Sequence, residues 1–368
     1  MRHLFMLGAA LVSVASLTGC GKQAPKPGAS PSGATVEEPA MRAAVDKLME
    51  DARAAFKPIP LAPPTIEGEE ATREKLALGT MLYFDPRLSA SHAISCASCH
   101  AIGLGGADNE PTSIGHRWQR GGRNAPTVFN AAYNMAQFWD GRAKDLFEQA
   151  GGPMVNPVEM ASPQGHIVEQ LKSLPAYNAV FAKAFPGQSD PITLANVQKA
   201  IAVFEATLIT PNAPFDIYLR GDNEALNPQQ KAGLRLFIDK GCSTCHNGVN
   251  VGGGMYAKFG VVSSPGDTLR PPADVGRFAV TKDEADRYAY KVPTLRNIAL
   301  TAPYFHTGQV WDLDGAIAVM GKVQLGTDLT PDEIARIAAF LGALTGDTPR
   351  VTIPALPPST AKTTRPQR

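Results

Sequence analysis

Two short stretches of the sequence pair cysteines with a histidine. The first, CASCH, begins at Cys96, and the second, CSTCH, begins at Cys242. In each, two residues separate the thiols, so one tight turn can present both to the vinyl groups of a haem, and the adjacent histidine falls beneath the iron. The repeated pattern predicts two covalently bound haem c groups. The predicted haem-binding residues are Cys96, Cys99, His100, Cys242, Cys245 and His246, with the two histidines as proximal iron ligands.

Other uses of a Cys-x-x-Cys pair fit this sequence less well. The chain has five cysteines, and Cys20 is the one outside the two motifs. Neither a disulfide nor a thioredoxin-like redox pair explains why a histidine follows both pairs. A zinc module is the main alternative, but the two motifs lie much farther apart than the two halves of a zinc ribbon.

Residues 1–20 have the features of an export signal, with Arg2 followed by an apolar stretch from Leu4 to Leu17. The ending LTGC resembles a bacterial lipoprotein signal, in which Cys20 becomes the lipidated first residue. An ordinary cleaved signal with an incidental cysteine is the alternative. Glycine rather than aspartate follows Cys20, which favours the outer membrane. We therefore predict a periplasmic protein held at the membrane by a lipid anchor only.

The charge balance and the length of the chain limit the kinds of partner and the domain organisation to be expected. The chain has 368 residues, with 35 basic and 34 acidic side chains and a net charge of +1. This balance gives no basis for a nucleic-acid partner. The length suffices for two domains that each bury a core. After the signal, no apolar run reaches the length of a membrane span.

Apolar spacing and proline positions predict a mainly α fold, with two cytochrome c-like domains in tandem, each with one covalent c-type haem, and long loops. A helix is expected before each motif, so that both units repeat one scheme. Thr330 is the expected N-cap of the last helix, with Pro331 at its first helical position. The stretches expected to be helical are 41–56, 73–88, 166–185, 193–209, 233–239 and 330–346.

Four longer runs resemble the bacterial di-haem cytochrome c peroxidases. They read GGADNEPTSIGHRW, GGRNAPTVFNAAYNMAQFWDGRAKDLFEQAGGPMVNPVEM, KVPTLRNIALTAPYFHTGQV and AVMGKVQLG, and the resemblance extends from about Leu76 to Leu344. It implies reduction of hydrogen peroxide to water with electrons from a small electron-donor protein, either a periplasmic cytochrome c or a cupredoxin. It also implies a homodimer. The alternatives are a di-haem electron carrier without catalysis and a di-haem enzyme that oxidises a protein or organic substrate.

The resemblance also implies a division of the chain. The expected parts are the signal peptide 1–20, a flexible tether and N-terminal helix 21–65, an N-terminal peroxidatic cytochrome c domain 66–210, a C-terminal electron-transfer cytochrome c domain 211–346, and an irregular tail 347–368.

Two further iron ligands follow from the resemblance. His116 matches a histidine that caps the distal side of the first haem in the oxidised enzyme and departs when the other haem is reduced, which would gate access of peroxide. Met320 matches the axial methionine of the second haem, and a thioether ligand raises the potential. Met255 is a rival for that position. A related group that matures methylamine dehydrogenase carries tyrosine in place of the methionine and lacks the histidine.

The catalytic residues implied are Glu159, Gln149 and Trp139. Glu159 matches a distal carboxylate that can move a proton between the peroxide oxygens, while Gln149 can hydrogen-bond peroxide but cannot take its proton. Trp139 matches a tryptophan between the haems through which electrons could pass.

A calcium ion is implied at Asn124, Thr301 and Pro303, where oxygen-only ligands suit Ca²⁺. Arg296 and Arg142 are candidates to pair with haem propionates. His92, His166 and His306 receive no role.

Overall fold

The computed structural model describes residues 47–367. The predicted signal peptide, the lipidated Cys20 and most of the tether lie outside the described residues. Contacts group residues 43–368 into one unit, within which the helical elements gather around two large apolar clusters. None of the helices in residues 47–367 combines the length and the apolar run needed to cross a bilayer.

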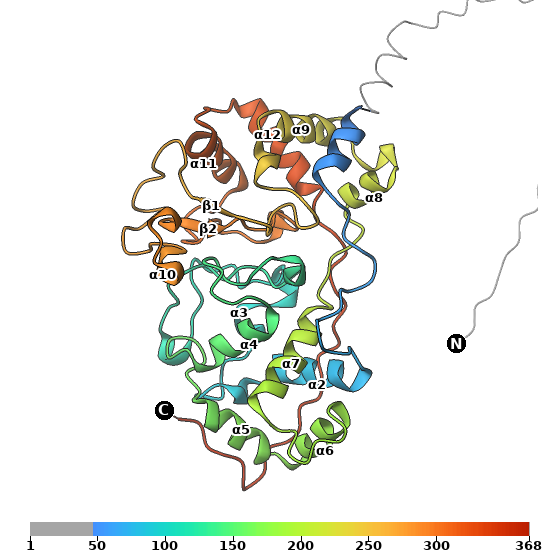
Figure 1. Cartoon of the computed structure of the whole chain (residues 1–368), viewed down its shortest axis with the longest axis vertical. Helices are drawn as coiled ribbons and strands as arrows, with labels where there is room; N and C mark the ends of the chain where they lie inside the picture. The colour runs from blue at the N-terminus through green and yellow to red at the C-terminus, as the bar shows by residue number, and fades with distance from the viewer. Residues whose placement is uncertain (1–46, 368) are drawn as a thin grey trace, which may run out of the picture. The chain divides into compact units, whose positions relative to one another are not determined.

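The fold is mainly helical, as predicted (Figure 1). The α-helices that follow the helical residues 47–55 are α2 (Arg73–Phe84), α3 (Cys96–Cys99), α4 (Leu146–Val155), α5 (Gln164–Lys172), α6 (Pro175–Ala184), α7 (Leu194–Glu205), α8 (Pro214–Arg220), α9 (Pro228–Asp239), α10 (Phe278–Thr281), α11 (Leu313–Leu325) and α12 (Pro331–Gly342). Short 3₁₀ turns are η1 (Pro86–Leu88), η2 (Ile102–Leu104), η3 (His116–Trp118), η4 (Ala131–Tyr133), η5 (Asn223–Ala225), η6 (Cys242–Thr244), η7 (Glu284–Asp286) and η8 (Ile298–Leu300).

A helix leads into each Cys-x-x-Cys-His motif and packs closely on a second helix. α2 precedes the first motif and lies against α7, and α9 precedes the second and lies against α12. Glycine permits both contacts: a Cβ atom at Gly79 would overlap the Ala200 carbonyl, and one at Gly233 would overlap the Arg336 carbonyl. The two motifs are therefore presented by equivalent helix pairs.

The first apolar cluster is formed by α2, α4, α5, α6 and α7. The predicted helical stretch 166–185 is divided between α5 and α6, because Pro175 cannot continue α5 and instead begins α6. Thr193 caps α7 through its side chain, which accepts a hydrogen bond from the Asn196 backbone amide.

The second apolar cluster is formed by α8, α9, α11, α12 and the helical residues 47–55. Phe56, at the end of that first helical segment, packs edge-on against Phe215 at 5.3 Å between ring centroids. Thr330 caps α12 in a capping box with Glu333, which confirms the predicted N-cap.

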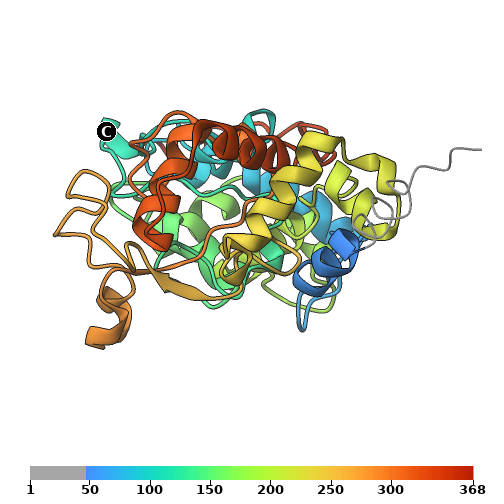
Figure 2. The same cartoon turned by 90° about the horizontal axis from the view of Figure 1, so that it is seen from above.

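Regular sheet in the described chain is confined to two short strands, which are joined by a long connection that contains α10 and η7. β1 (Tyr256–Lys258) pairs antiparallel with β2 (Ala289–Lys291), with Tyr256 opposite Lys291. Most of the remaining chain between the helices runs in loops. In Figure 2 the short helix α10 lies apart from the other helices, at the edge of the view.

Candidate active site

The second motif opens onto a cavity of about 240 Å³. Cys242, Cys245 and His246 line it, and Met320 reaches it from α11. Most of the remaining lining is apolar, including Phe237, Phe259, Leu313, Ile317 and Leu341. Free thiols, an imidazole and an apolar surround are the groups that a covalent haem requires. Met255 does not line this cavity, so the geometry favours Met320 over its rival.

His246 is held in the form that can ligate a metal. Burial lowers the pKa of His246 to about 4, and the backbone of Val251 and Pro293 opposes that shift without reversing it. The imidazole is therefore neutral at physiological pH, as axial ligation requires.

The first motif, like the second, presents its two cysteines from one short helical turn. Cys96 and Cys99 bound the single turn α3, which Ser95 and Ser98 cap reciprocally. The Tyr83 hydroxyl on α2 donates a hydrogen bond of 2.6 Å to the His100 carbonyl and so ties the motif to its helix. Burial also lowers the pKa of His100, again against the backbone of a neighbouring proline, Pro126.

His116 and Glu159 lie on adjacent backbone segments beside the first motif. The His116 amide donates a hydrogen bond of 2.8 Å to the Glu159 carbonyl. Burial raises the pKa of Cys99, and the Asp108 and Glu159 carboxyl groups raise it further. Burial raises the pKa of Glu159, partly offset by Arg142 and by the Asn156 amide, which donates to Oε1 at 3.0 Å. A half-buried carboxyl group thus accompanies the first motif.

The His116 imidazole is buried, and its Nδ1 has no hydrogen-bond partner in the structure. Its loop is closed by backbone bonds, including one of 2.8 Å from Gly115 to the Gln119 carbonyl. Arg117 and Trp118 both adopt positive φ, which is uncommon for residues other than glycine. An unbonded ring on a loop of this conformation can be released without losing a side-chain hydrogen bond through Nδ1.

Gln149 lies on α4, whose C-terminal end leads into the turn that carries Glu159. Asp145 caps this helix by accepting a hydrogen bond from the Glu148 amide. The Gln149 side chain is half-buried and has no hydrogen-bond partner in the described chain. It is therefore free to bond a small polar molecule.

Trp139 lies in the wall of the second cavity. Its Nε1 donates a hydrogen bond of 2.9 Å to the Asn124 carbonyl, and its ring meets His306 edge-on at 6.0 Å. It packs in the same cluster as Phe259 and Met320. The previously unassigned His306 is thus a neighbour of the tryptophan.

The three residues implied for calcium all line the same cavity. The Asn124 amide nitrogen donates to the Glu110 carbonyl at 2.9 Å, which leaves the amide oxygen free of that bond. Residues 47–367 contain no group of three or more His, Cys, Asp or Glu arranged for a metal. A cation beside Asn124, Thr301 and Pro303 would therefore depend on amide and carbonyl oxygens.

The two arginines expected near haem propionates are engaged elsewhere. Arg296 is only 1 % exposed and forms a buried ion pair of 2.8 Å with Asp216 of α8. Arg142 pairs with Asp140 at 3.0 Å and lies over the Phe138 ring.

Lys291 was missed by the sequence reasoning. It lines the second cavity at 6 % exposure and forms no ion pair in the described chain. Burial lowers its pKa to about 8. Lysine is usually solvated, so only the apolar residues around it in AYKVPTL could have signalled its burial.

His92 and His166 remain outside this site. The Nε2 atoms of both rings are buried without a hydrogen bond, and burial lowers the pKa of His92.

Comparison with known proteins indicates the same family that the sequence resembles. A family model described as di-haem cytochrome c peroxidase matches residues 73–224. The cytochrome c551 peroxidase of Pseudomonas aeruginosa is 54 % identical over 324 residues, which cover 88 % of this chain and 94 % of that protein. The cytochrome c551 peroxidase of Nitrosomonas europaea is 52 % identical, covering 79 % of this chain and 85 % of that protein.

Among solved structures, a MauG-like protein associated with microbial copper homeostasis superimposes with a TM-score of 0.70 at 29 % identity, covering 79 % of this chain and 94 % of that one. The di-haem peroxidase BthA of Burkholderia thailandensis, at 22 % identity and a TM-score of 0.63, shares the fold and covers 81 % of this chain and 91 % of that one. On the extent and identity of these matches, the chain belongs to the bacterial di-haem cytochrome c peroxidase family.

Proposed function

We propose that the chain reduces hydrogen peroxide to two waters, consuming two protons and two electrons that arrive singly from a small cytochrome c or cupredoxin. The observation that carries this assignment is an asymmetry between the motifs. A half-buried carboxyl group, Glu159, lies near Cys99, whereas the cavity of the second motif is lined by no Asp or Glu. Proton transfer therefore belongs to the first motif, and electron storage to the second.

The residues present fit two covalent haems, one in each half of the proposed division near residue 211. Each would be attached through its cysteine pair, with His100 or His246 as proximal ligand. When bound, the haems supply the iron that reacts with peroxide and the site that stores an electron. Met320 would complete the second site, and Lys291 supplies a cation for an acidic group of the haem in that cavity.

Glu159 is assigned the proton transfer. Its Oε1 accepts a hydrogen bond from Asn156, so Oε2 is the oxygen available to take a proton from one peroxide oxygen and return it to the other as water leaves. Gln149, with its amide unpaired, would orient the peroxide without exchanging protons.

His116 is assigned the gate. While its imidazole occupies the open side of the first site, peroxide has no access, and its release clears that position. The absence of a hydrogen bond at Nδ1 supports a ligand that can leave. Trp139 is assigned the path between the two sites, since it lines the second cavity in the same apolar cluster as Met320.

Further proposals concern the calcium ion, the electron donor, the oligomeric state and the location of the enzyme. Asn124, Thr301 and Pro303 would bind a weakly held Ca²⁺ through oxygens. The relatives named cytochrome c551 peroxidases support a small cytochrome c as the donor. We also infer a homodimer and a periplasmic location, with Cys20 as the lipid attachment to the outer membrane.

The test is steady-state oxidation of a reduced small cytochrome c by peroxide, with and without prior one-electron reduction of the enzyme. Glu159→Gln is compared with Glu169→Gln, an exposed residue on α5. Turnover only after pre-reduction, lost in Glu159→Gln and kept in Glu169→Gln, is the expected result. Turnover without pre-reduction would exclude an obligatory His116 gate. If several donors gave no turnover in either state, a carrier or a protein-oxidising enzyme would replace the peroxidase.

A further inference from the structure

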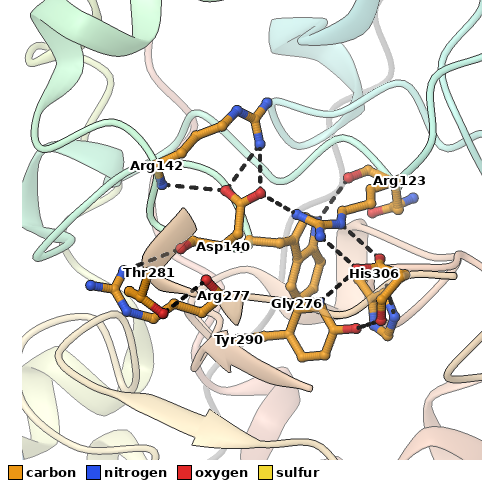
Figure 3. A network of polar contacts seen from close by, with 11 residues as sticks. Arg123, Asp140, Arg142, Gly276, Arg277, Thr281, Tyr290 and His306 are labelled. Atoms are coloured by element: carbon orange, nitrogen blue, oxygen red, sulfur yellow. Dashed lines mark hydrogen bonds and ion pairs between the residues drawn. The ribbon is translucent and has the colours of Figure 1, made fainter. Parts of the chain in front are cut away.

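One arginine joins two acidic side chains that lie far apart in the sequence (Figure 3). The Arg123 guanidinium contacts Asp274 through both arms of a fork, Nε at 2.8 Å and Nη2 at 2.6 Å. Its remaining nitrogen, Nη1, donates to Asp140 at 2.7 Å. Every nitrogen of the guanidinium is thus engaged, and such forked contacts are among the strongest polar interactions in proteins.

The same two segments are joined by a second link beside the first. Arg123 is bonded to Asp140, and the neighbouring residues Asn124 and Trp139 are joined by the indole hydrogen bond of 2.9 Å. The segments that contain Arg123 and Trp139 are therefore joined by two adjacent side-chain links. A shift of the indole away from Asn124 would break its hydrogen bond.

Asp274 is hydrogen-bonded to the wall of the second cavity. Its carbonyl accepts a hydrogen bond of 3.1 Å from the Tyr290 hydroxyl, and the Tyr290 ring stacks on His306 at 4.2 Å. Both rings line the cavity. Although burial alone would raise the pKa of Asp274, the contact with Arg123 lowers it, so this carboxylate remains charged and paired.

Backbone hydrogen bonds complete the attachment. The Lys291 amide donates to the Trp139 carbonyl at 2.7 Å, and the Asn124 amide donates to the His306 carbonyl at 2.8 Å. These bonds and the indole bond to Asn124 hold the two chain segments together. The Arg123 side chain adds the charged link, which ties Asp140, the neighbour of Trp139, to Asp274.

We propose that Arg123 is a positioning residue for electron transfer between the two motifs, acting by holding the Trp139 indole against the second cavity. The inference rests on the proposed role of Trp139 as the electron path. Arg123 acts on the geometry of that path and touches no reacting atom.

Arg142 offers a matched control. It also pairs with Asp140, at 3.0 Å, but it makes no contact with Asp274 and its side chain is 44 % exposed. Replacing either arginine by lysine preserves the charge. Only Arg123→Lys removes the fork, because a single ammonium group cannot reproduce three differently placed nitrogens.

The first measurement is hydrogen–deuterium exchange of the indole N–H groups in the haem-loaded protein, followed by ultraviolet resonance Raman. The chain has three tryptophans, and the other two, Trp118 and Trp311, are 85 % and 60 % exposed, so the slowly exchanging indole is Trp139. We expect Arg123→Lys to accelerate this slow exchange about tenfold, since a charged hydrogen-bond network is weakened, and Arg142→Lys to leave it within about twofold.

The second measurement is the rate of electron transfer between the haems after one-electron reduction, together with both midpoint potentials. Arg123→Lys should slow the transfer about tenfold, the effect expected when the free energy of activation rises by about 1.4 kcal/mol, while both potentials stay unchanged. Combining it with Trp139→Phe should slow the transfer no further than Trp139→Phe alone.

The outcomes distinguish the proposed electron path through Trp139 from the proposed positioning role of Arg123. If Trp139→Phe slows the transfer and Arg123→Lys does not, the tryptophan path stands and the positioning role of Arg123 is wrong. If Trp139→Phe has no effect, the path itself fails. If Arg123→Lys does not accumulate with both haems, Asp274→Asn is measured in its place. The proposal would be overturned if the indole exchange rate and the electron-transfer rate of Asp274→Asn equalled those of Arg142→Lys.

Discussion

Glu159 is a carboxyl group that its surroundings keep protonated to higher pH than an exposed glutamate. Proton abstraction from peroxide requires the carboxylate, so activity should be complete above the raised pKa and should fall as the pH drops through it. We expect Glu159→Gln to lower kcat by about 10²-fold or more, the usual contribution of general acid–base catalysis. The measurement is the pH profile of kcat. An acid limb that persists unchanged in residual Glu159→Gln activity would assign it to another group.

Glu205 is a buried carboxyl group beside the first motif, at the end of α7. Burial raises its pKa to about 8, and it interacts electrostatically with Cys96 and Tyr83. Because the folded-state pKa exceeds the unfolded one, the folded protein binds the extra proton. Its stabilising effect is therefore complete below about pH 4.5 and is lost as the pH rises through about 8.

Glu205→Gln should remove that loss. We expect the variant to melt several degrees higher than the parent at pH 9 and to differ little at pH 5. Thermal unfolding followed by circular dichroism at both pH values measures this, with the exposed Glu224→Gln as control. Equal melting temperatures of parent and variant at pH 9 would show that the Glu205 carboxylate is tolerated.

Residues that carry local chemistry could be predicted from the sequence, whereas residues that act through distant partners could not. A Cys-x-x-Cys-His motif contains its whole chemistry within five positions, so both attachment sites were recognisable. The role of Arg123 depends on Asp274, which is 151 residues away in the chain. The burial of Lys291 depends on the fold of several loops. The ion pair of Arg296 likewise depends on a distant residue, since its partner Asp216 belongs to another element.

At the scale of elements, the helix pairs α2/α7 and α9/α12 place the two motifs. Their existence could be predicted from apolar spacing and from capping residues such as Thr330. The division between α5 and α6 follows from Pro175 alone. The loops that form the cavity wall have no periodicity, and their conformation depends on contacts such as the stacking of Tyr290 on His306. For this reason the cavity could not be drawn from the sequence.

The close crossing of α2 and α7 makes Gly79 a sensitive position. A methyl group there would meet the Ala200 carbonyl and the Phe204 side chain, so the helices would have to separate. We expect Gly79→Ala to reduce the free energy of unfolding by about 1–3 kcal/mol, as overpacking does. Gly165→Ala on α5, where a Cβ atom meets nothing within 4 Å, should be neutral or slightly stabilising. Denaturant unfolding of both variants compares them, and equal stabilities would contradict the tight crossing.

At the scale of the whole molecule, both ends of the described chain cross over to stabilise parts remote in sequence. Residues 47–56 pack in the cluster formed by α8, α9, α11 and α12, although a long stretch separates them in the chain. The final residues, after α12, return to the cluster that surrounds the first motif, as the red trace of Figure 1 shows. The two ends thus connect the surroundings of both motifs.

The returning segment makes specific bonds beside the first motif. Arg87 donates a hydrogen bond of 2.7 Å to the Pro357 carbonyl, and the Gln367 amide donates one of 2.7 Å to the Ala90 carbonyl. Val351 packs in the cluster that includes Cys96 and Tyr83. The segment has no helix or strand, so these contacts with the first cluster are what order it.

Removing residues 347–368 should therefore loosen the first motif and leave the second intact. We expect faster backbone hydrogen exchange in α2 and α3 of the truncated protein, with α9 and α12 unchanged, because the contacts of Val351, Pro357 and Gln367 fall on the first side and the bonds of Asp347 to Pro211 and Asn212 touch neither α9 nor α12. Exchange followed by mass spectrometry measures each helix separately. Val351→Ala, which removes one apolar contact and no hydrogen bond, should show a weaker form of the same pattern. Equal acceleration in α2 and α12 would mean instead that the chain opens as a single cooperative unit, in which the tail stabilises both motifs alike.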